Sequence, residues 1–330
     1  MTSKQRSAPA SLATVAAAAG VSIATVSRIV NGETRRASAE TVERVRKAIA
    51  VVGYQPNHAG RTLRRRESRL VAMLAPNLDN PVMAAIAAST EAALRAAGYV
   101  MILCDTHDRP DLQDEYLNAM RSQVVRGYIM VASVPSAVLK DFVADGAPMV
   151  FVNRRPPFGR GAFVGIDNIK AGADAADMLW SGGLRRCGVL APAQGSSVTQ
   201  DRVKGFCSRL RALGAEEILK AEAPGRSHLD IGYEAAQRLV TSDGWPDGLM
   251  CVSDQIAYGA YRLARERNIL VPERCMLVGI DGNPLNRWIA PWLRSIQVKY
   301  DDFGQPIVEL LDHVWRGSSH AQRIMPHCVA

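Results

Sequence analysis

From Leu70 onward, short apolar runs alternate with amphipathic helical stretches along the chain, starting with LVAMLAP at 70–76. Uninterrupted apolar strands separated by helices are typical of parallel sheets that are covered on both faces and built from right-handed crossovers. Nearly ten such units are too many for one open sheet in 330 residues, so we expect two α/β lobes side by side. Ligands of such sheets bind outside the carboxyl ends of the strands, which places a ligand cleft between the lobes.

The predicted strands are 70–76, 99–104, 127–133, 148–153, 162–166, 187–192, a weak one at 216–222, 248–253, 275–281 and 294–298, followed by a strand-like run at 324–330. The predicted helices between them are about 82–97, 111–123, 135–145, 168–182, 199–213, 229–242, 255–267 and 301–316.

The stretch before these units has a different pattern, two short helices separated by a glycine. Ser11 can cap a first helix whose apolar residues recur at i, i+3, i+4 and i+7, and Gly20 can end it in a left-handed turn. Ser22 can cap a second helix over 23–30. Two helices joined by a short turn with a glycine are typical of the helix-turn-helix, whose second helix enters the DNA major groove. An alanine-rich hairpin in any small helical protein has the same pattern, so this interpretation needs further support.

Charge segregation supplies that support. Residues 1–69 contain thirteen lysines and arginines against four acids, a net charge of +9, whereas the whole chain carries +8, so the remaining 261 residues carry −1. A third helix, capped by Ser38 and ended by Gly53, completes a small helical core in this basic region. A basic head on a neutral body is the electrostatic pattern of a polyanion-binding module joined to a module with another ligand.

Several functional classes lack their usual signals. The six cysteines occur singly, without C-x-x-C, and the six histidines form no i, i+4 pair, so we expect reduced cysteines, no metal site and no cofactor. No phosphate-loop, nucleophile-elbow or H-E-x-x-H motif is present, so we expect no enzyme activity. No run of eighteen apolar residues and no apolar signal region occurs, so we expect a cytoplasmic protein that does not contact membranes.

Eight ordered motifs resemble the LacI/GalR (lactose-repressor) family of bacterial transcription regulators. They are VAAAAGVSIATVSRIVN (15–31), GYQPN (53–57), the linker ending at Leu63, LVAMLAPNLDNPV (70–82), DRVKGF (201–206), CVSDQIAYGAY (251–261), LVGIDG (277–282) and APWLRSIQ (290–297). The run GIDGNPLNRWIAPWLRSI (279–296) is also similar to the gluconate-responsive branch of that family.

The resemblance implies that 23–30 is the recognition helix and that the linker forms a hinge helix on DNA, with Leu63 inserted in the minor groove. Arg28 can bond guanine bidentately, whereas Ile23 and Ala24 offer only apolar contact. Gly60 should make hinge folding harder because glycine has a low helix propensity. The implied DNA-contacting residues are Ser22, Ile23, Ala24, Thr25, Ser27, Arg28, Asn31, Arg61, Leu63 and Arg64.

In the body, the resemblance implies a small effector between the lobes, a sugar or a related metabolite. The implied effector-binding residues are Arg154, Arg202, Ser253, Asp254 and Asp281. The surplus of cations at Arg154, Arg155 and Arg202 favours a sugar acid, although Arg154 and Arg155 before two prolines are equally typical of ordinary surface charge.

We therefore predict an all-α helix-turn-helix head and an α/β two-lobed periplasmic-binding-protein-like body. The predicted divisions are a DNA-binding domain at 1–57, a hinge at 58–69 and a body at 70–330, with lobes at about 70–166 plus 298–318 and about 167–297 plus 319–330. The predicted protein is a homodimeric repressor, with a tetramer left open, that binds a near-palindromic operator in double-stranded DNA under effector control. The rival classes are a periplasmic-type solute carrier, which would need a signal peptide and no basic head, and a sugar-processing enzyme.

Overall fold

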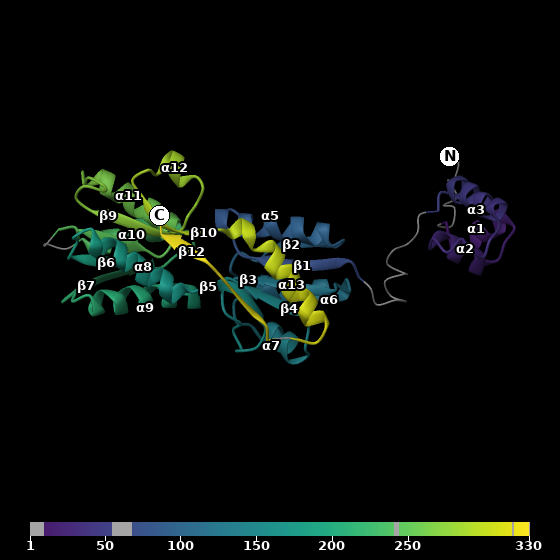
Figure 1. The fold of residues 1–330 in the computed structure, drawn as a ribbon, viewed down its shortest axis with the longest axis horizontal. Coiled ribbons are helices and arrows are strands. Elements are labelled where there is room, and N and C mark those ends of the chain that lie inside the picture. Colours follow the sequence, from purple (N-terminus) through teal and green to yellow (C-terminus); the bar gives the residue numbers. More distant parts are fainter. Residues whose placement is uncertain (1–9, 55–67, 241–243, 319, 330) are drawn as a thin grey trace, which may run out of the picture. The chain divides into compact units, whose positions relative to one another are not determined.

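The computed structural model describes residues 10–54, 68–240, 244–318 and 320–329 (Figure 1). The chain divides into two compact units, Met1–Glu67 and Ser68–Ala330, here called the head and the body.

The head consists of the helices α1 (Leu12–Ala19), α2 (Ile23–Val30) and α3 (Ala39–Val52) around one small core. The predicted helices are confirmed, and so are their serine caps, because the hydroxyls of Ser11, Ser22 and Ser38 each accept a hydrogen bond from the backbone N–H three residues later. Gly20 ends α1 with a φ of 64°, the left-handed conformation that glycine adopts without steric cost. The buried core residues of the three helices are Val15, Ala16, Ala19, Val26, Ile29, Val42, Val45 and Ala48.

No single helix among the described residues has the length and apolarity to cross a bilayer. Helices α1 and α2 reach that length and apolarity only when they are counted together, and the chain bends by 107° at the break between them.

The first lobe of the body is a six-stranded parallel sheet in the order β11-β5-β4-β3-β1-β2. Its strands are β1 (Leu70–Ala75), β2 (Val100–Asp105), β3 (Gly127–Val131), β4 (Met149–Val152), β5 (Ala162–Ile166) and β11 (Gln322–Met325). Its helices are α5 (Pro81–Ala96), α6 (Pro110–Ser122), α7 (Ala137–Ala144) and α13 (Gly304–Trp315). Alternate residues of β1 pack on opposite sides of the sheet. Val71 and Met73 belong to the core that includes residues of α5 and α13, and Ala72 and Leu74 belong to the core that includes residues of α6 and α7.

The second lobe has the sheet order β12-β10-β9-β8-β6-β7. Its strands are β6 (Cys187–Pro192), β7 (Ile218–Ala223), β8 (Gly248–Cys251), β9 (Met276–Asp281), β10 (Arg294–Val298) and β12 (His327–Val329). Its helices are α8 (Asn168–Ser181), α9 (Ser197–Ala212), α10 (His228–Leu239), α11 (Asp254–Glu266) and the short α12 (Asn286–Ile289), and a 3-10 turn, η1 (Tyr300–Asp302), follows β10. The predicted strands and long helices are confirmed to within a few residues, whereas α12 was not predicted.

Helices α8 and α9 pack so closely that their backbones touch at glycines. A Cβ atom on Gly172 of α8 would lie 2.0 Å from the carbonyl oxygen of Arg202 on α9, and one on Gly205 of α9 would lie 1.9 Å from that of Ile169 on α8. The same reciprocal arrangement joins α10 and α11 at Gly232 and Gly259. Because this contact fixes α9 against α8, it also fixes Arg202, a residue of the cleft.

The end of the chain differs from the prediction of one strand at 324–330 within the second lobe. Gln322–Met325 (β11) pairs in parallel with β5 of the first lobe, and only His327–Val329 (β12) pairs, antiparallel, with β10 of the second. Pro326 separates the two strands, and proline has no N–H to continue a ladder. The prediction that 319–330 belongs to the second lobe is therefore wrong for β11.

Candidate functional site

The exposed face of α2 is the first candidate site. Ile23 is 53% exposed, and Ala24 and Arg28 are also exposed, while Val26 and Ile29 on the opposite face are buried in the core of the head. The hydroxyl of Ser22 accepts a hydrogen bond from the Thr25 backbone N–H at 3.1 Å, which satisfies one of the free N–H groups at the start of the helix. Seven predicted DNA-contacting residues are described and lie on or beside this face: Ser22, Ile23, Ala24, Thr25, Ser27, Arg28 and Asn31.

The other predicted DNA-contacting residues, Arg61, Leu63 and Arg64, lie outside the described residues, as does Gly60. Within the described head, the charged side chains of Arg28, Arg35, Arg36, Arg44, Arg46 and Lys47 are available at its surface. Arg44 forms an ion pair with Glu40, but this pair is wide at 4.0 Å and solvent-exposed, so it neutralises little of the positive charge.

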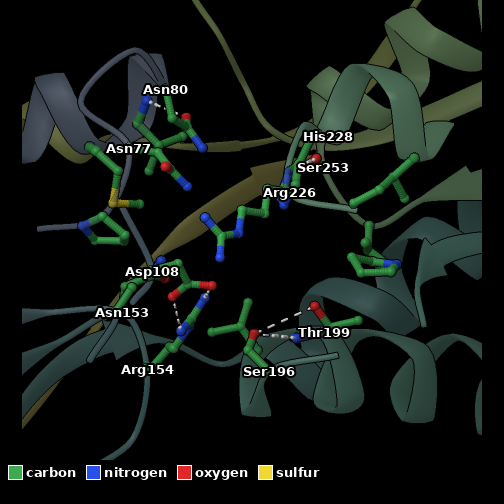
Figure 2. A pocket seen from close by; sticks show the side chains of 18 of the residues that line it. Asn77, Asn80, Asp108, Asn153, Arg154, Ser196, Thr199, Arg226, His228 and Ser253 are labelled. Atoms are coloured by element: carbon green, nitrogen blue, oxygen red, sulfur yellow. Dashed lines mark hydrogen bonds and ion pairs between the residues drawn. The ribbon is translucent and has the colours of Figure 1, made fainter. Parts of the chain in front are cut away.

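The second candidate site is a cavity of about 150 Å³ between the two lobes of the body (Figure 2). Most of its lining residues follow the carboxyl ends of strands or begin the helices after them, the usual ligand position in parallel sheets. The first lobe contributes the polar residues Asn77, Asn80, Asp108, Asn153 and Arg154, and the second contributes Gln194, Ser196, Thr199, Arg202, Arg226, His228, Ser253 and Asp281.

Arg154 lines the cavity, as predicted, but its charge is neutralised by an acid. Its Nη1 and Nη2 atoms lie 2.8 and 3.4 Å from the two carboxylate oxygens of Asp108, a bidentate pair that is drawn in Figure 2. Arg155 does not line the cavity and forms an ion pair with Asp201 at 2.9 Å. These two arginines therefore do not supply the free cations that the sequence pattern predicted.

Arg202 and Asp281 form the buried polar centre of the second lobe. Arg202 is only 4% exposed, and its guanidinium donates to the side-chain oxygen of Asn168 at 2.9 Å and to the carbonyl oxygen of Val252 at 2.6 Å. Its Nη1 lies 3.3 Å from Oδ1 of Asp281, which also accepts a hydrogen bond from the Tyr300 hydroxyl at 3.0 Å. Burial raises the pKa of Asp281 to about 7, although Arg202 opposes this shift.

Asp254 is the predicted effector residue that does not line the cavity. Its carboxylate is buried and accepts hydrogen bonds from the Ser295 hydroxyl at 2.6 Å, the Asn283 backbone N–H at 2.8 Å and the Asn286 side-chain amide at 2.8 Å. Burial raises the pKa of Asp254. The carboxylate thus fixes the start of α12 and the loop after β9, the strand whose last residue is Asp281.

Ser253 does line the cavity, and it is joined there by a residue that was not predicted, His228. The Ser253 hydroxyl caps α11 and lies 2.9 Å from Nδ1 of His228, the first residue of α10. Burial, followed by the charges of Arg202 and Arg154, lowers the pKa of His228. The imidazole is therefore neutral at pH 7 and offers one donor and one acceptor.

The other unpredicted polar residues share a position that sequence reasoning could have used. Asn77, Asp108, Asn153, Gln194 and Arg226 each lie at the carboxyl end of a predicted strand or within a few residues after it. Among the described residues, no group of three or more histidines, cysteines, aspartates or glutamates is placed to hold a metal ion.

Two family models match the chain. The model of "Bacterial regulatory proteins, lacI family" matches residues 11–57, and the model of a periplasmic binding protein-like domain matches residues 176–329.

Relatives match over almost the full length. The transcriptional regulator MalR of Streptomyces coelicolor is 31% identical over 310 residues, which cover 91% of this chain and 88% of that protein. The transcriptional repressor CytR of Escherichia coli strain K12 is 29% identical over 326 residues, covering 96% of this chain and 95% of that protein. The structure of the lac repressor dimer bound to operator and an anti-inducer has a TM-score of 0.85 at 22% identity, with 98% of both chains covered. The predicted fold class is thereby confirmed.

Proposed function

The chain belongs to the lacI family of bacterial regulatory proteins and is a DNA-binding transcriptional regulator, and on this premise we propose how it reads DNA and is controlled. It acts as a repressor and a homodimer, each head binding one half of a near-palindromic operator through the exposed face of α2. A small polar metabolite of the sugar class, bound in the cleft cavity, changes its operator affinity. Its place of action is the cytoplasm, where its DNA is.

The observation that carries the DNA-reading proposal is the exposed face of the capped helix α2. A helix that buries Val26 and Ile29 and exposes Ile23, Ala24 and Arg28 has the shape that fits the major groove, N-terminal end first. Of these exposed side chains, only Arg28 can make bidentate hydrogen bonds to a base, and its preferred partner is guanine. Sequence reading by hydrogen bonds therefore depends heavily on Arg28.

Arg28→Ala tests this assignment. An operator is first selected from a pool of random duplexes with the full-length protein, and affinities for that operator and for random DNA are then measured by fluorescence anisotropy at several salt concentrations. The variant should lose about 1–3 kcal/mol of discrimination at one base position because a bidentate base contact is lost. Arg64→Ala is the matched control, and it should weaken all sequences alike and reduce the salt slope by about one. Equal losses of Arg28→Ala on operator and random DNA would refute its role in base reading.

The effector proposal rests on the composition of the cavity. Its lining is rich in amides, hydroxyls and charged groups from both lobes, and such groups fix the orientation of a ligand that has many hydroxyls. A volume of about 150 Å³ suits a small molecule, since an engineered protein cavity of about this size binds benzene, a six-membered ring. Arg154, Arg202, Ser253 and Asp281 are the predicted effector residues that line it.

Control of DNA binding requires that the effector favour one arrangement of the body over another. The cavity is lined by both lobes, so a ligand that contacts both changes how they are held together. We propose that this change reaches the heads through the linker at 58–69, where Arg61, Leu63 and Arg64 contact DNA. Sedimentation equilibrium of the purified chain, with and without operator, distinguishes the proposed dimer from a monomer or a tetramer.

A further inference from the structure

We propose that the effector carries an anionic group, a carboxylate or a phosphate, and that Arg226 binds this group. This inference rests on the proposed function, because it assigns the chemistry of the ligand that fills the cleft cavity.

The charged groups of the cavity do not balance. Arg154 is paired with Asp108 at 2.8 Å and Arg202 with Asp281 at 3.3 Å, so each of these arginines has its own acid. Arg226 also lines the cavity, and it takes part in no hydrogen bond or ion pair with any of the described residues. Three arginines against two aspartates leave one positive charge, since His228 is neutral.

Arg226 is well placed to contact a ligand. It lies in the loop between β7 and α10, two residues before the first residue of that helix. Figure 2 shows its side chain reaching into the space that the other labelled side chains surround, with no dashed line to any of them. The residue is exposed, so its guanidinium is hydrated as long as the cavity holds only water.

Ligand binding changes the surroundings of this cation. A ligand that fills the cavity displaces water from Arg226. If the guanidinium loses this water without gaining an anionic partner, the complex with the ligand is strongly destabilised. A carboxylate or phosphate restores the balance through two parallel N–H···O bonds in the geometry that guanidinium prefers. A neutral sugar of the same size cannot do so. The unpaired arginine therefore selects against neutral ligands as well as for anionic ones.

Two further features of the cavity act in the same direction. The first turns of α9 and α10 line it through Ser196, Thr199 and His228, and the amino ends of helices carry partial positive charge. Asp281, the acid of the second pair, has a pKa of about 7 because it is buried, so it carries a full negative charge only above neutral pH. Both features raise the positive potential that an anionic ligand meets.

Isothermal titration calorimetry of the full-length chain with matched ligand pairs tests the inference. The acids are a panel of aldonates (including gluconate), uronates and sugar phosphates, and each is measured beside its neutral parent, for example gluconate beside sorbitol and glucose 6-phosphate beside glucose. We expect at least one acid to bind at least about tenfold more tightly than its parent, because a hydrogen bond to a charged group is worth about 1.4 kcal/mol or more, a factor of ten. The carboxylate and phosphate arms distinguish the two sources of negative charge.

Three variants separate the role of Arg226 from general effects. Arg226→Gln should weaken the preferred acid about tenfold to hundredfold and reduce the salt dependence of its binding. The neutral parent should bind the variant at least as tightly as the wild type, because no unpaired cation is then desolvated. Arg226→Lys keeps the positive charge but loses the planar guanidinium that donates two parallel hydrogen bonds, so it should retain part of the affinity for the acid. Arg211→Gln is the matched control, since Arg211 is exposed in the last turn of α9, roughly 20 Å along the helix from its cavity end, and should bind like the wild type.

The inference is overturned if a neutral parent binds as tightly as every acid, if no acid binds, or if Arg226→Gln binds the preferred acid like the wild type. DNA binding is measured separately by selection from random duplexes. A chain that selects a specific operator but prefers a neutral sugar therefore overturns the anionic assignment alone, whereas a chain that binds an acid but no specific DNA overturns the proposed function.

Discussion

Asp281→Asn removes a buried carboxyl group whose titration should control the stability of the body near neutral pH. The pKa of Asp281 is raised from 3.8 to about 7, mainly by burial. Each unit of difference between the folded and unfolded pKa corresponds to about 1.36 kcal/mol, so three units correspond to about 4 kcal/mol. The folded state holds the proton up to about pH 7, whereas the unfolded chain releases it near pH 4. This contribution to stability is therefore fully present below about pH 4 and is lost as pH rises to about 7.

The assay is urea unfolding followed by tryptophan fluorescence, which reports on the body alone because all five tryptophans lie beyond residue 179. The unfolding free energy of the wild type minus that of Asp281→Asn should fall by about 3 kcal/mol between about pH 4.5 and about pH 8.5, since part of the loss precedes the lower pH. Asp145→Asn, which removes an exposed carboxyl at the end of α7, is the matched control.

The amide of the variant does not titrate, so the effects of the substitution other than the loss of this titration are the same at every pH and cancel from the comparison. A difference between wild type and Asp281→Asn that stays constant within about 1 kcal/mol across this range would show that Asp281 is ionised throughout. In that case the Arg202 ion pair, not burial, controls the carboxyl, and the raised pKa of Asp281 is refuted.

Two further predictions concern packing and capping. Gly205→Ala should destabilise the body by about 1–3 kcal/mol, or roughly 2–9 °C in Tm. The new Cβ would lie 1.9 Å from the carbonyl oxygen of Ile169, and this strain exceeds the gain in helix propensity of about 1 kcal/mol. The control Gly182→Ala places a Cβ no closer than 3.3 Å to any atom and should be nearly neutral, so equal Tm values for the two variants would contradict the close helix contact. Ser22→Ala should destabilise the head by about 1 kcal/mol because it removes the acceptor for the Thr25 N–H. In a thermal melt, circular dichroism should show helix loss at a lower temperature, while the tryptophan fluorescence of the body stays unchanged. A head that melts at the wild-type temperature would mean that water replaces the cap fully.

Local patterns predicted most of the fold. The apolar runs and their spacing indicated the parallel strands and long helices, and Ser11, Ser22 and Ser38 marked three helix starts, because capping depends only on residues within one turn. The end of the chain was less accessible. Residues 322–329 form two strands in two different sheets, and their partners, β5 and β10, are determined by tertiary packing, not by the local pattern.

The position of a cleft residue could be predicted where it depends on the local sequence. It was missed where it depends on a partner that is distant in the sequence. Arg154 was correctly placed at the cleft, but the pair that neutralises it joins residues 46 positions apart, so its charge state was not apparent. Asp254 was predicted to face the effector, yet hydrogen bonds from Ser295 and the loop after β9 turn its carboxylate away. Arg226 lies in no recognisable motif, and only its position after a strand end indicates the cleft.

The crossing of the last strands between the lobes has a consequence for how the protein is made. In the finished body, β5 is entirely buried and one of its edges is covered by β11, which is synthesised about 155 residues later. At translation rates of about 5–20 residues per second, this interval lasts roughly 8–30 s. During that time the emerging first lobe has an apolar strand at an open sheet edge, a known hazard for aggregation. The head, complete by residue 54, can fold at once on the ribosome, whereas the sheet of the first lobe is completed only when β11 has been synthesised.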